Sequence, residues 1–196
     1  VPISDLGAGN YTLTVTTITE EDFNPVTATS KITVNKVDST LAVDNIEFEY
    51  GSEGSGDVLF TGACMVIANV ITQPKAVVNV NGKKITVSGL AVGTYTLNVT
   101  TVPDENHTAV SQTAAITVNK VNSTLMVDDV VLNYGDSINV TVTATGATGI
   151  TAKINGTNVT VVNNFTVPIS DLGAGNYTLT VTTIADGNHN PVTATS

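Results

Sequence analysis

The chain has 196 residues, of which 34 are Thr and 30 are Val, while aromatic residues make up only 5% and Trp is absent. Thr and Val are β-branched and favour strands over helices, so the composition predicts an all-β protein. Seventeen acidic residues against seven Lys and no Arg give a net charge of −10, which argues against nucleic-acid partners because binding to a phosphate backbone needs clustered cations.

Strands are predicted where apolar and polar residues alternate, beginning with YTLTV at residues 11–15. Tyr11, Leu13 and Val15 fall on one face there, which is the period of two of a half-buried strand. The same alternation recurs at 31–34, 46–50 and 138–144. Turn residues punctuate the chain about every ten residues. In one full repeat we expect about seven strands, near residues 39–43, 46–50, 57–61, 66–71, 76–88, 94–101 and 109–118.

An internal repeat organises the chain. The pattern L-x-x-G-x-Y-T-L-x-V-T-T occurs three times, and a second marker, N-K-V-[DN]-S-T-L, begins at Asn35 and again at Asn119. The resulting period of about 83 residues suits one small domain rather than a solenoid repeat. We therefore expect residues 1–36 to be the C-terminal half of a domain, 37–120 a complete domain, and 121–196 a domain without the end of its last strand.

The closest internal copy lies two repeats away. Residues 1–30 match residues 167–196 at 25 of 30 positions, and both resemble 85–114 far less. This indicates duplication of a two-domain block. We expect the chain to be a segment of a longer tandem array. The sequence Lys-Ile-Thr-Val-Asn-Lys, or a near variant, should follow Ser196, because it follows the equivalent Ser30.

About seven short strands per repeat favour an immunoglobulin-like (Ig-like) β-sandwich. In that fold a Tyr near the start of strand F donates a hydrogen bond to backbone a few residues upstream, at the E–F corner. The sequence predicts such tyrosine corners at Tyr11, Tyr95 and Tyr177, each preceded two residues earlier by a glycine: Gly9, Gly93 and Gly175. Two residues after each Tyr stands Leu rather than Cys, which predicts an aliphatic core without a disulfide.

Five segments carry a family resemblance: NKVNSTL (119–125), LNYG (132–135), TGATG (145–149), ITVSGLAVGTYTLNVTTVPDENHT (85–108) and AITVNK (115–120). Together they resemble the Ig-like tandem repeats of large adhesin-like cell-surface proteins, which are abundant in methanogenic archaea and related to bacterial Ig-like repeats. The resemblance covers essentially the whole chain. It implies a very long parent protein, a secreted or surface-anchored location and no shared active site. TGACM at 61–65 departs from the pattern, because it puts Cys64 at a usually polar turn.

No arrangement of a nucleophile and a base emerges from the sequence. The single Cys64 has only His107 and His189 as candidate bases, and these occupy equivalent loop positions in different repeats, where the third position is Phe23. A lone cysteine forms no internal disulfide. No apolar run approaches the roughly 20 residues of a membrane span. We therefore expect no enzyme and no membrane insertion in this segment.

The loop after each YTL strand is acidic. It contains Glu20-Glu21-Asp22 in the first repeat, Asp104-Glu105 in the second and Asp186 in the third. Ca²⁺ takes roughly six to eight oxygen ligands, but none of these loops has the spacing of a calcium-binding motif. We therefore interpret these acidic residues as solvated turn residues. Ca²⁺ at these loops stays an open alternative, and no other cofactor is expected.

Nine Asn-x-Ser/Thr sequons predict N-glycosylation if the protein is extracellular. They are Asn10, Asn98, Asn106, Asn122, Asn139, Asn155, Asn158, Asn164 and Asn176. Several, such as Asn98, fall at outward strand positions. In a chain so rich in Asn and Thr some sequons arise by chance, so they fit an extracellular glycoprotein without establishing one.

The leading functional hypothesis is a non-catalytic stalk or spacer of an extracellular cell-surface protein, whose partners are neighbouring Ig-like domains. The short link after Val34 has neither Gly nor Pro, so successive domains should hinge little. A second hypothesis is an adhesin module that binds a host or microbial surface ligand, for example by strand addition. A third is a filament in which identical chains complete one another's domains, although residues 1–30 would supply strands that 167–196 already provide.

Overall fold

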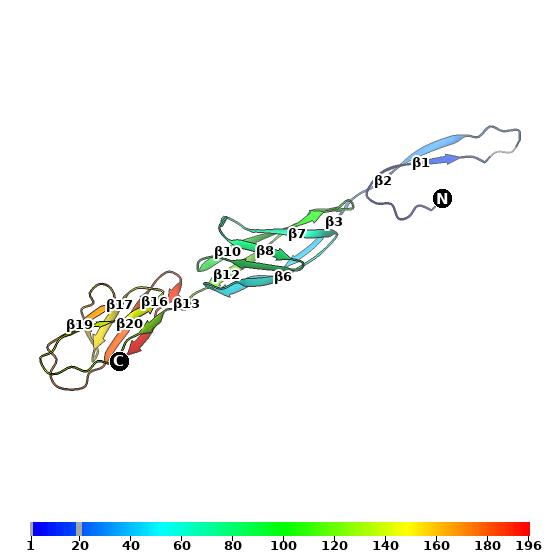
Figure 1. Ribbon diagram of the computed structural model, residues 1–196. Coiled ribbons are helices and arrows are strands. Elements are labelled where there is room, and N and C mark those ends of the chain that lie inside the picture. The colour runs from blue at the N-terminus through cyan, green and yellow to red at the C-terminus, as the bar shows by residue number, and fades with distance from the viewer. Residues whose placement is uncertain (1, 19–20) are drawn as a thin grey trace. The chain divides into compact units, whose positions relative to one another are not determined.

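β-Strands are the only regular secondary structure in the residues that the structure describes, 2–18 and 21–196 (Figure 1). The structure is a computed structural model. In this described part of the chain no helix is long and apolar enough to cross a membrane. The all-β class predicted from the Thr and Val content is therefore confirmed.

The chain begins with an antiparallel hairpin of β1 (Gly9–Thr16) and β2 (Thr27–Val34). The predicted alternation is present, with Tyr11 and Leu13 half-buried. Val15, expected on the same inward face, is instead 48% exposed. The reason is that, among the described residues, no second sheet pairs with this hairpin.

The next long strands form two four-stranded sheets (Figure 1). The first has the order β4-β6-β9-β8, with bounds Thr40–Val43, Gly54–Thr61, Lys84–Ser88 and Val77–Asn81. The second has the order β5-β12-β10-β7, with bounds Ile46–Glu49, Ser111–Asn119, Gly93–Pro103 and Ala63–Val70. Lettered along the chain as A, A′ and B to G, these orders read A-B-E-D and A′-G-F-C. Constant-type Ig domains have sheets ABED and CFG, so this part of the chain is an Ig-like β-sandwich.

One predicted strand, at 76–88, is in fact the two strands β8 and β9. They pair antiparallel with Asn81 opposite Lys84, so that only Gly82 and Lys83 form the loop. Gly82 has a φ of +60°, a conformation that glycine adopts without steric cost and that two-residue hairpin loops require. β-Branched residues flank the turn on both sides, which is why composition alone predicts one long strand.

The core of this sandwich is aliphatic. Leu97 and Val99 of β10 and Ile116 of β12 are all 0% exposed. Leu97 stands where an antibody domain carries a cysteine of its inter-sheet disulfide, so the predicted disulfide-free core is confirmed. Full burial of such side chains contributes about 1.5–3 kcal/mol each.

The C-terminal residues form a second set of sheets (Figure 1). One has the order β18-β17-β20-β22, with bounds Thr157–Val159, Ala147–Ile154, Leu179–Ala185 and Thr193–Thr195. The pairs β14-β16 and β15-β19 have bounds Thr124–Met126, Thr143–Thr145, Ile138–Thr141 and Thr166–Ile169. The strand predicted at 138–144 is interrupted at Val142, whose N–H donates to the carbonyl of Phe165 at 2.9 Å.

One apolar cluster forms the core of this second set. It comprises Val140, Val142, Ile150, Ala152, Val167, Ile169, Leu179 and Val181. These residues come from β15 and β19 as well as from β17 and β20. The core therefore lies between the pair β15-β19 and the four-stranded sheet, as in a sandwich.

Two short parallel pairs complete the structure. β3 (Val37–Asp38) pairs with β11 (His107–Thr108), and β13 (Val121–Asn122) pairs with β21 (His189–Asn190). β3 and β13 lie within the two copies of the N-K-V-[DN]-S-T-L marker. Their pairing therefore fixes the start of the second and third repeats to the loop after strand F of the same repeat.

The chain divides into two compact units that do not coincide with the repeats. Unit 1 is Val1–Ile46, Gly54–Ser88 and Tyr95–Ile116, and unit 2 is Glu47–Glu53, Gly89–Thr94 and Thr117–Ser196. The division passes through β5, β10 and β12. The domain boundaries expected at 36/37 and 120/121 therefore stay predictions.

Candidate functional site

Two loops share the sequence Asp-x-Asn-His, at residues 104–107 in unit 1 and 186–189 in unit 2, and we call them the joint loops. In the first, Asp104 Oδ1 accepts hydrogen bonds from the backbone N–H groups of Asn106 and His107, at 2.8 and 2.7 Å. His107 Nδ1 lies 2.8 Å from the same oxygen. The loop is thus folded around one carboxylate.

Both joint-loop carboxylates are held in the ionised form. The hydrogen bond from the His107 side chain lowers the pKa of the Asp104 carboxyl, and the backbone donors of the loop lower it further. In the second loop Asp186 Oδ1 accepts from the N–H of Asn188 at 2.8 Å and lies 2.7 Å from His189 Nδ1. The pKa of Asp186 is lowered chiefly by that histidine. Hydrogen bonds that favour the charged form have this effect.

The imidazole of each joint loop covers a glycine. A Cβ added at Gly62 would lie 2.7 Å from Cγ of His107, and one at Gly146 would lie 2.5 Å from Cγ of His189. Both glycines also have positive φ, +69° and +67°. This backbone conformation is energetically unfavourable for any residue that has a side chain. Sterics and backbone conformation thus both select glycine at these two turns.

A buried serine fastens each joint loop to the turn beneath it. Ser39 Oγ lies 2.8 Å from the carbonyl oxygen of Gly62 and 2.9 Å from that of Thr108. Ser123 Oγ lies 3.0 Å from the carbonyl of Gly146 and 2.9 Å from a carbonyl in β21. Each serine is 5% exposed. The serine of the N-K-V-[DN]-S-T-L marker therefore has the same bonding role in both repeats.

The asparagine of each joint loop reaches a turn that belongs to the preceding repeat. Asn106 Oδ1 accepts a hydrogen bond from the N–H of Ala8 at 2.7 Å, within unit 1. Asn188 Oδ1 accepts one from the N–H of Val92 at 2.9 Å, within unit 2. Ala8 and Val92 hold the same position in their repeats, since each immediately precedes the glycine of a corner, Gly9 or Gly93. The same contact between the same atoms is therefore made twice.

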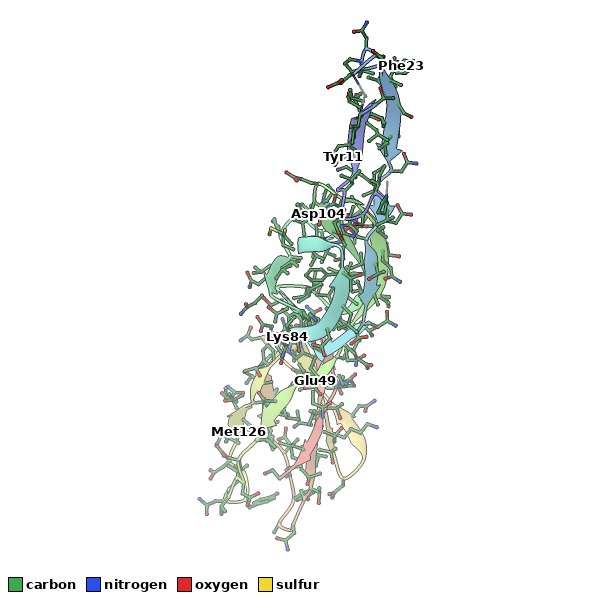
Figure 2. The ribbon with its side chains drawn as sticks, turned by 90° about the vertical axis from the view of Figure 1, so that its right-hand side faces the viewer. Tyr11, Phe23, Glu49, Lys84, Asp104 and Met126 are labelled. Carbon is green, nitrogen blue, oxygen red and sulfur yellow. The ribbon has the colours of Figure 1, made fainter. Side chains whose placement is uncertain are left out.

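The turn that receives the asparagine contains the predicted tyrosine corner. Tyr11 Oη donates to the carbonyl of Gly7 at 2.8 Å, and Figure 2 shows Tyr11 on this hairpin. A Cβ at Gly7 would lie 2.9 Å from Oδ1 of Asn106, so the asparagine packs tightly on the turn. In unit 2, Tyr177 Oη donates to the carbonyl of Gly173 at 3.2 Å. Both hydroxyls thus bond to the carbonyl four positions upstream.

The other residues predicted for the corners hold comparable positions. Gly9 is the first residue of β1 and Gly93 the first of β10, and Tyr95 is half-buried in β10. Gly175 lies two positions before Tyr177, in the segment that leads into β20. The glycine and tyrosine thus stand at the start of strand F or just before it in all three copies.

Further contacts hold each joint loop in place. In unit 2 the ring of His189 packs edge-on against that of Tyr50, with centroids 5.6 Å apart and planes at 80°. Such pairs contribute about 0.5–1.5 kcal/mol beyond the burial of their area. In unit 1, Lys36 Nζ donates to the carbonyl of Asp104 at 2.8 Å. Both loops are therefore tied on more than one side.

Within the described residues, the acidic loops considered for Ca²⁺ form no ligand set. Of Glu20-Glu21-Asp22, Glu20 lies outside the described residues, and Glu21 and Asp22 are exposed. In the described part of the chain, no three His, Cys, Asp or Glu side chains gather into a metal site. The carboxylate oxygens of Asp104 and Asp186 are engaged within the joint loops.

The residues weighed for catalysis lie in different surroundings. Cys64 is a free, exposed thiol in β7. The Nδ1 atoms of His107 and His189 bond to the aspartates of their own loops. The histidines therefore have a structural role in the joint loops.

The sequon asparagines differ in how their amide groups are used. Asn98 points outward from β10 between the buried Leu97 and Val99, as predicted. Asn155 Oδ1 accepts from the N–H of Thr178 at 2.9 Å. Hydrogen bonds to neighbouring side chains also occupy Oδ1 of Asn10 and Asn122. Four further sequon asparagines are exposed: Asn139, Asn158, Asn164 and Asn176.

Sequence reasoning treats the joint loops only as acidic turns and misses their role. Two signals point to them. The Asp-x-Asn-His tetrad recurs at the same place in two successive repeats, beginning at Asp104 and at Asp186. The five differences between residues 1–30 and 167–196 also all fall at 19–23, the counterpart of this loop. The near-identical repeats therefore differ only where the joint loop lies.

No protein-family model and no curated protein matches the chain. Several solved structures are similar to it. The I9–I11 tandem of titin is 20% identical with a TM-score of 0.38, over 98% of this chain and 74% of that one. An ICAM-5 D1–D4 ectodomain fragment is 12% identical with a TM-score of 0.40, over 97% of this chain and 56% of that one.

The fibronectin(III)-like modules of CbhA from Clostridium thermocellum are also similar. They are 16% identical to the chain with a TM-score of 0.32, over 80% of this chain and 92% of that one. Because these TM-scores are low, the Ig-like assignment rests on the sheet orders A-B-E-D and A′-G-F-C.

Proposed function

We propose that the chain is a non-catalytic spacer segment, built of tandem Ig-like domains, of an extracellular adhesin-like cell-surface protein. Its domains are residues 1–36, 37–120 and 121–196. The N-K-V marker and the short strands β3 and β13 stand at the same point of the second and third segments, which supports these boundaries. The direct partners are the neighbouring domains of the same array.

The observation that carries this proposal is the recurrent joint. Asn106 with Ala8 and Asn188 with Val92 join equivalent atoms of successive repeats at 2.7 and 2.9 Å. A segment whose role is to set spacing needs the same joint at each step. A ligand-binding module or an enzyme has no such requirement. The joint is therefore the feature that favours a spacer over the alternatives.

The tyrosine corners fit the same role. We assign Tyr11, Tyr95 and Tyr177, with Gly9, Gly93 and Gly175, as the corners that shape the turn on which a joint loop docks. At Tyr11 the hydroxyl bonds to Gly7, in the turn that also donates to Asn106. The tyrosine hydroxyl holds the turn in one conformation, so the N–H of Ala8 keeps a constant direction toward Asn106.

An extracellular location is supported by the surface chemistry. The chain carries a net charge of −10 and nine sequons, and four of these sequons have exposed asparagines other than those whose Oδ1 atoms accept the hydrogen bonds described above. A high net charge keeps a long protein soluble. We assign the exposed group, Asn139, Asn158, Asn164 and Asn176, as the main candidates for glycosylation.

Small-angle X-ray scattering tests the spacer role. The double variant Asn106→Ala/Asn188→Ala removes the acceptors of the Ala8 and Val92 N–H groups. It leaves the strands unchanged. We expect a broader distribution of interdomain distances with an unchanged circular dichroism spectrum. Asn139→Ala is the matched control, because this asparagine is exposed on β15, and it should scatter like the wild type. Identical scattering from all three chains would contradict the proposal.

A further inference from the structure

One long strand of the middle sandwich has a free edge. β7 is the last strand of the sheet β5-β12-β10-β7, so within the described residues it pairs with β10 alone. The other edge strands of this sandwich, β4, β5 and β8, have only four or five residues, whereas β7 has eight. Its sequence Ala-Cys-Met-Val-Ile-Ala-Asn-Val contains no charged residue and no proline. Natural proteins shorten exposed edges or place charges on them, because an open edge pairs readily with another strand.

The backbone of β7 alternates between its two sides. The N–H of Ile71, just after the strand, donates to the carbonyl of Thr96 at 2.9 Å. Hydrogen-bonded residues alternate in an antiparallel pair, so the backbone groups of Ile67 and Asn69 are directed to β10 as well. Three residues direct their N–H and C=O groups to the free side instead: Val66, Ala68 and Val70. A strand laid along this side would find three evenly spaced residues to bond.

Irregular backbone limits this edge at both ends. The register of β7 with β10 shifts just before Val66, where a β-bulge interrupts the regular pairing. Beyond the strand, the N–H of Gln73 donates to the carbonyl of Val70 at 3.4 Å, which turns the chain away. The regular edge is therefore residues 66–70, and Ala68 is its midpoint.

Exposed apolar side chains line the outer face of the same strand. Met65 is 53% exposed, Ile67 57% and Ile71 42%. Even numbers of residues separate them, so they share one face. The corresponding strand of the C-terminal repeat is β17, because TGACM at 61–65 aligns with TGATG at 145–149. Its residues at the three positions are small or polar: Gly149, Thr151 and Asn155.

The two corresponding strands also differ in pairing. β17 pairs with β18 on one side and with β20 on the other, and it carries Lys153 at the position of Asn69. After β7, in contrast, the chain turns into β8, which pairs with β9 in the other sheet. The free edge and the uncharged apolar face thus occur together in the same repeat. This coincidence indicates that a further strand covers β7.

We propose that β7 binds β7 of a second copy of this chain, antiparallel and about a two-fold axis through Ala68. In this register Ala68 pairs with its own counterpart, and Val66 of each copy pairs with Val70 of the other. Every backbone group that the regular edge directs to the free side then has a partner. The two four-stranded sheets become one continuous sheet.

The outer face is self-complementary in this register. Met65 of one copy lies opposite Ile71 of the other, and Ile67 lies diagonal to both Ile67 and Ile71 of the other copy. Opposite and diagonal neighbours on one face of a sheet are within reach of long side chains. The pairing therefore removes apolar surface of both copies from water, which is the main favourable contribution to association.

Charge favours a second copy in the antiparallel orientation. Glu105 is exposed and lies near the start of β7, since Pro103 pairs with Ala63. Lys75 is exposed in the turn beyond the end of β7. Antiparallel pairing brings the start of one strand beside the end of the other, so Glu105 of each copy comes to the end that carries Lys75 of the other. Complementary charges of this kind fix orientation, and the paired strands add no like charges to the contact.

Sedimentation velocity over a range of concentrations tests the pairing on the full chain. The wild type should form a dimer whose fraction rises with concentration, because an isologous contact closes at two copies. Ile67→Lys should weaken dimerisation about tenfold or more, since it places a charge in the apolar contact. Leu59→Lys is the matched control, because Leu59 is 60% exposed on β6 in the other sheet, and it should dimerise like the wild type. Unchanged circular dichroism spectra show that both variants fold.

Two outcomes of this experiment would overturn the proposal. One is a wild-type chain that stays monomeric at every concentration, which would exclude a second copy as the occupant of the edge. The other is equal dimerisation of Ile67→Lys and Leu59→Lys, which would place the contact elsewhere. The pairing does not involve the asparagines of the joint loops, so its failure would leave the spacer role unaffected.

Amide hydrogen exchange followed by NMR tests the register. In concentrated wild-type protein three N–H groups should exchange about tenfold more slowly than in Ile67→Lys at the same concentration, because they gain acceptors. They are the N–H groups of Val66, Ala68 and Val70. The N–H groups of the edge strand β4 are the internal reference and should exchange equally in both proteins. Slower exchange at β4 but not at β7, or oligomers larger than a dimer, would contradict the two-fold pairing of β7.

Discussion

His107 occupies the space that any side chain at Gly62 would need. An added Cβ there would lie 2.7 Å from the imidazole Cγ, and the same relationship recurs between Gly146 and His189 at 2.5 Å. The ring has little freedom to turn away, because its Nδ1 is held 2.8 Å from Asp104 Oδ1. The joint loop thus dictates the residue at a turn that lies far earlier in the chain.

Gly62→Ala should lower the free energy of unfolding by about 2–5 kcal/mol. About 1–2 kcal/mol comes from an L-residue at positive φ, and about 1–3 kcal/mol from displacing a packed neighbour. Gly82→Ala is the matched control, because Gly82 has a φ of +60° but nothing within 4 Å of an added Cβ. It should show the backbone cost alone. Urea unfolding followed by circular dichroism measures both.

A double variant separates the two causes. If the imidazole is responsible for the excess, Gly62→Ala/His107→Ala should lose less than the sum of the two single losses. Equal losses for Gly62→Ala and Gly82→Ala would instead mean that the imidazole moves aside at no cost, and the steric argument would be wrong.

The sandwich could be predicted from the sequence because its signals are local. The alternation IEFEY places Ile46 and Phe48 on one face, and they are 1% and 9% exposed in β5. Val15 follows the same rule in sequence but is exposed, because burial needs a facing sheet and that requirement is not local. Period-two patterns therefore predict the face of a strand, and tertiary packing decides whether that face is covered.

The joint loops could not be predicted in the same way. Their bonds join residues as far apart as Ala8 and Asn106, which no short-range periodicity encodes. Turn chemistry predicts an aspartate that accepts backbone N–H groups, as Asp104 does, but not which distant turn the neighbouring asparagine contacts. The sequence shows only the recurrence of the Asp-x-Asn-His tetrad and the clustering of the five repeat differences at residues 19–23.

Tyr177→Phe should lower the free energy of unfolding by about 0.5–1.5 kcal/mol, because it removes the hydroxyl that donates to the carbonyl of Gly173 at 3.2 Å. Tyr134→Phe is the control, since Tyr134 is 85% exposed, and its effect should stay within about 0.5 kcal/mol. Thermal unfolding of both variants measures the difference. Equal shifts in Tm would mean that the corner hydroxyl contributes nothing measurable.

Ser39→Ala should cost about 1–3 kcal/mol, because it removes the buried hydroxyl that bonds to the carbonyl of Gly62, whereas the carbonyl of Thr108 keeps the N–H of residue 39 as a donor at 3.2 Å. Ser55→Ala, on the exposed face of β6, is the matched control and should be nearly neutral. Chemical denaturation compares the two. A loss at Ser39 no larger than that at Ser55 would contradict a fastening role for the buried serine.

Glycosylation should favour Asn139 over Asn106 when the protein is isolated from its natural source. The carboxamide of Asn106 accepts from Ala8 and sits so close to the turn that a Cβ at Gly7 would be 2.9 Å from its Oδ1. A glycan on the same carboxamide would crowd the joint, whereas Asn139 is exposed on β15. Glycopeptide mass spectrometry measures the occupancy of each site. Full occupancy of Asn106 would show that the joint tolerates a glycan or opens to accept one.

Acid should weaken the second joint loop through Asp186. The hydrogen bond from His189 lowers the pKa of this carboxyl below its ordinary value of 3.8. A group with a lower pKa in the folded state adds stability at pH values above its ordinary, unfolded pKa, and that stability is lost as the pH falls through the pKa of the folded state. The difference in free energy of unfolding between the wild type and Asp186→Asn should therefore narrow as the pH is lowered from about 5 to about 2.

His189→Gln is the control, because it removes the main cause of the lowered pKa. In that background the free energy of unfolding should change less over the same pH range. Urea unfolding at stepped pH measures these differences, and a wild-type curve that runs parallel to that of Asp186→Asn over this range would show that the carboxylate does not stabilise the joint.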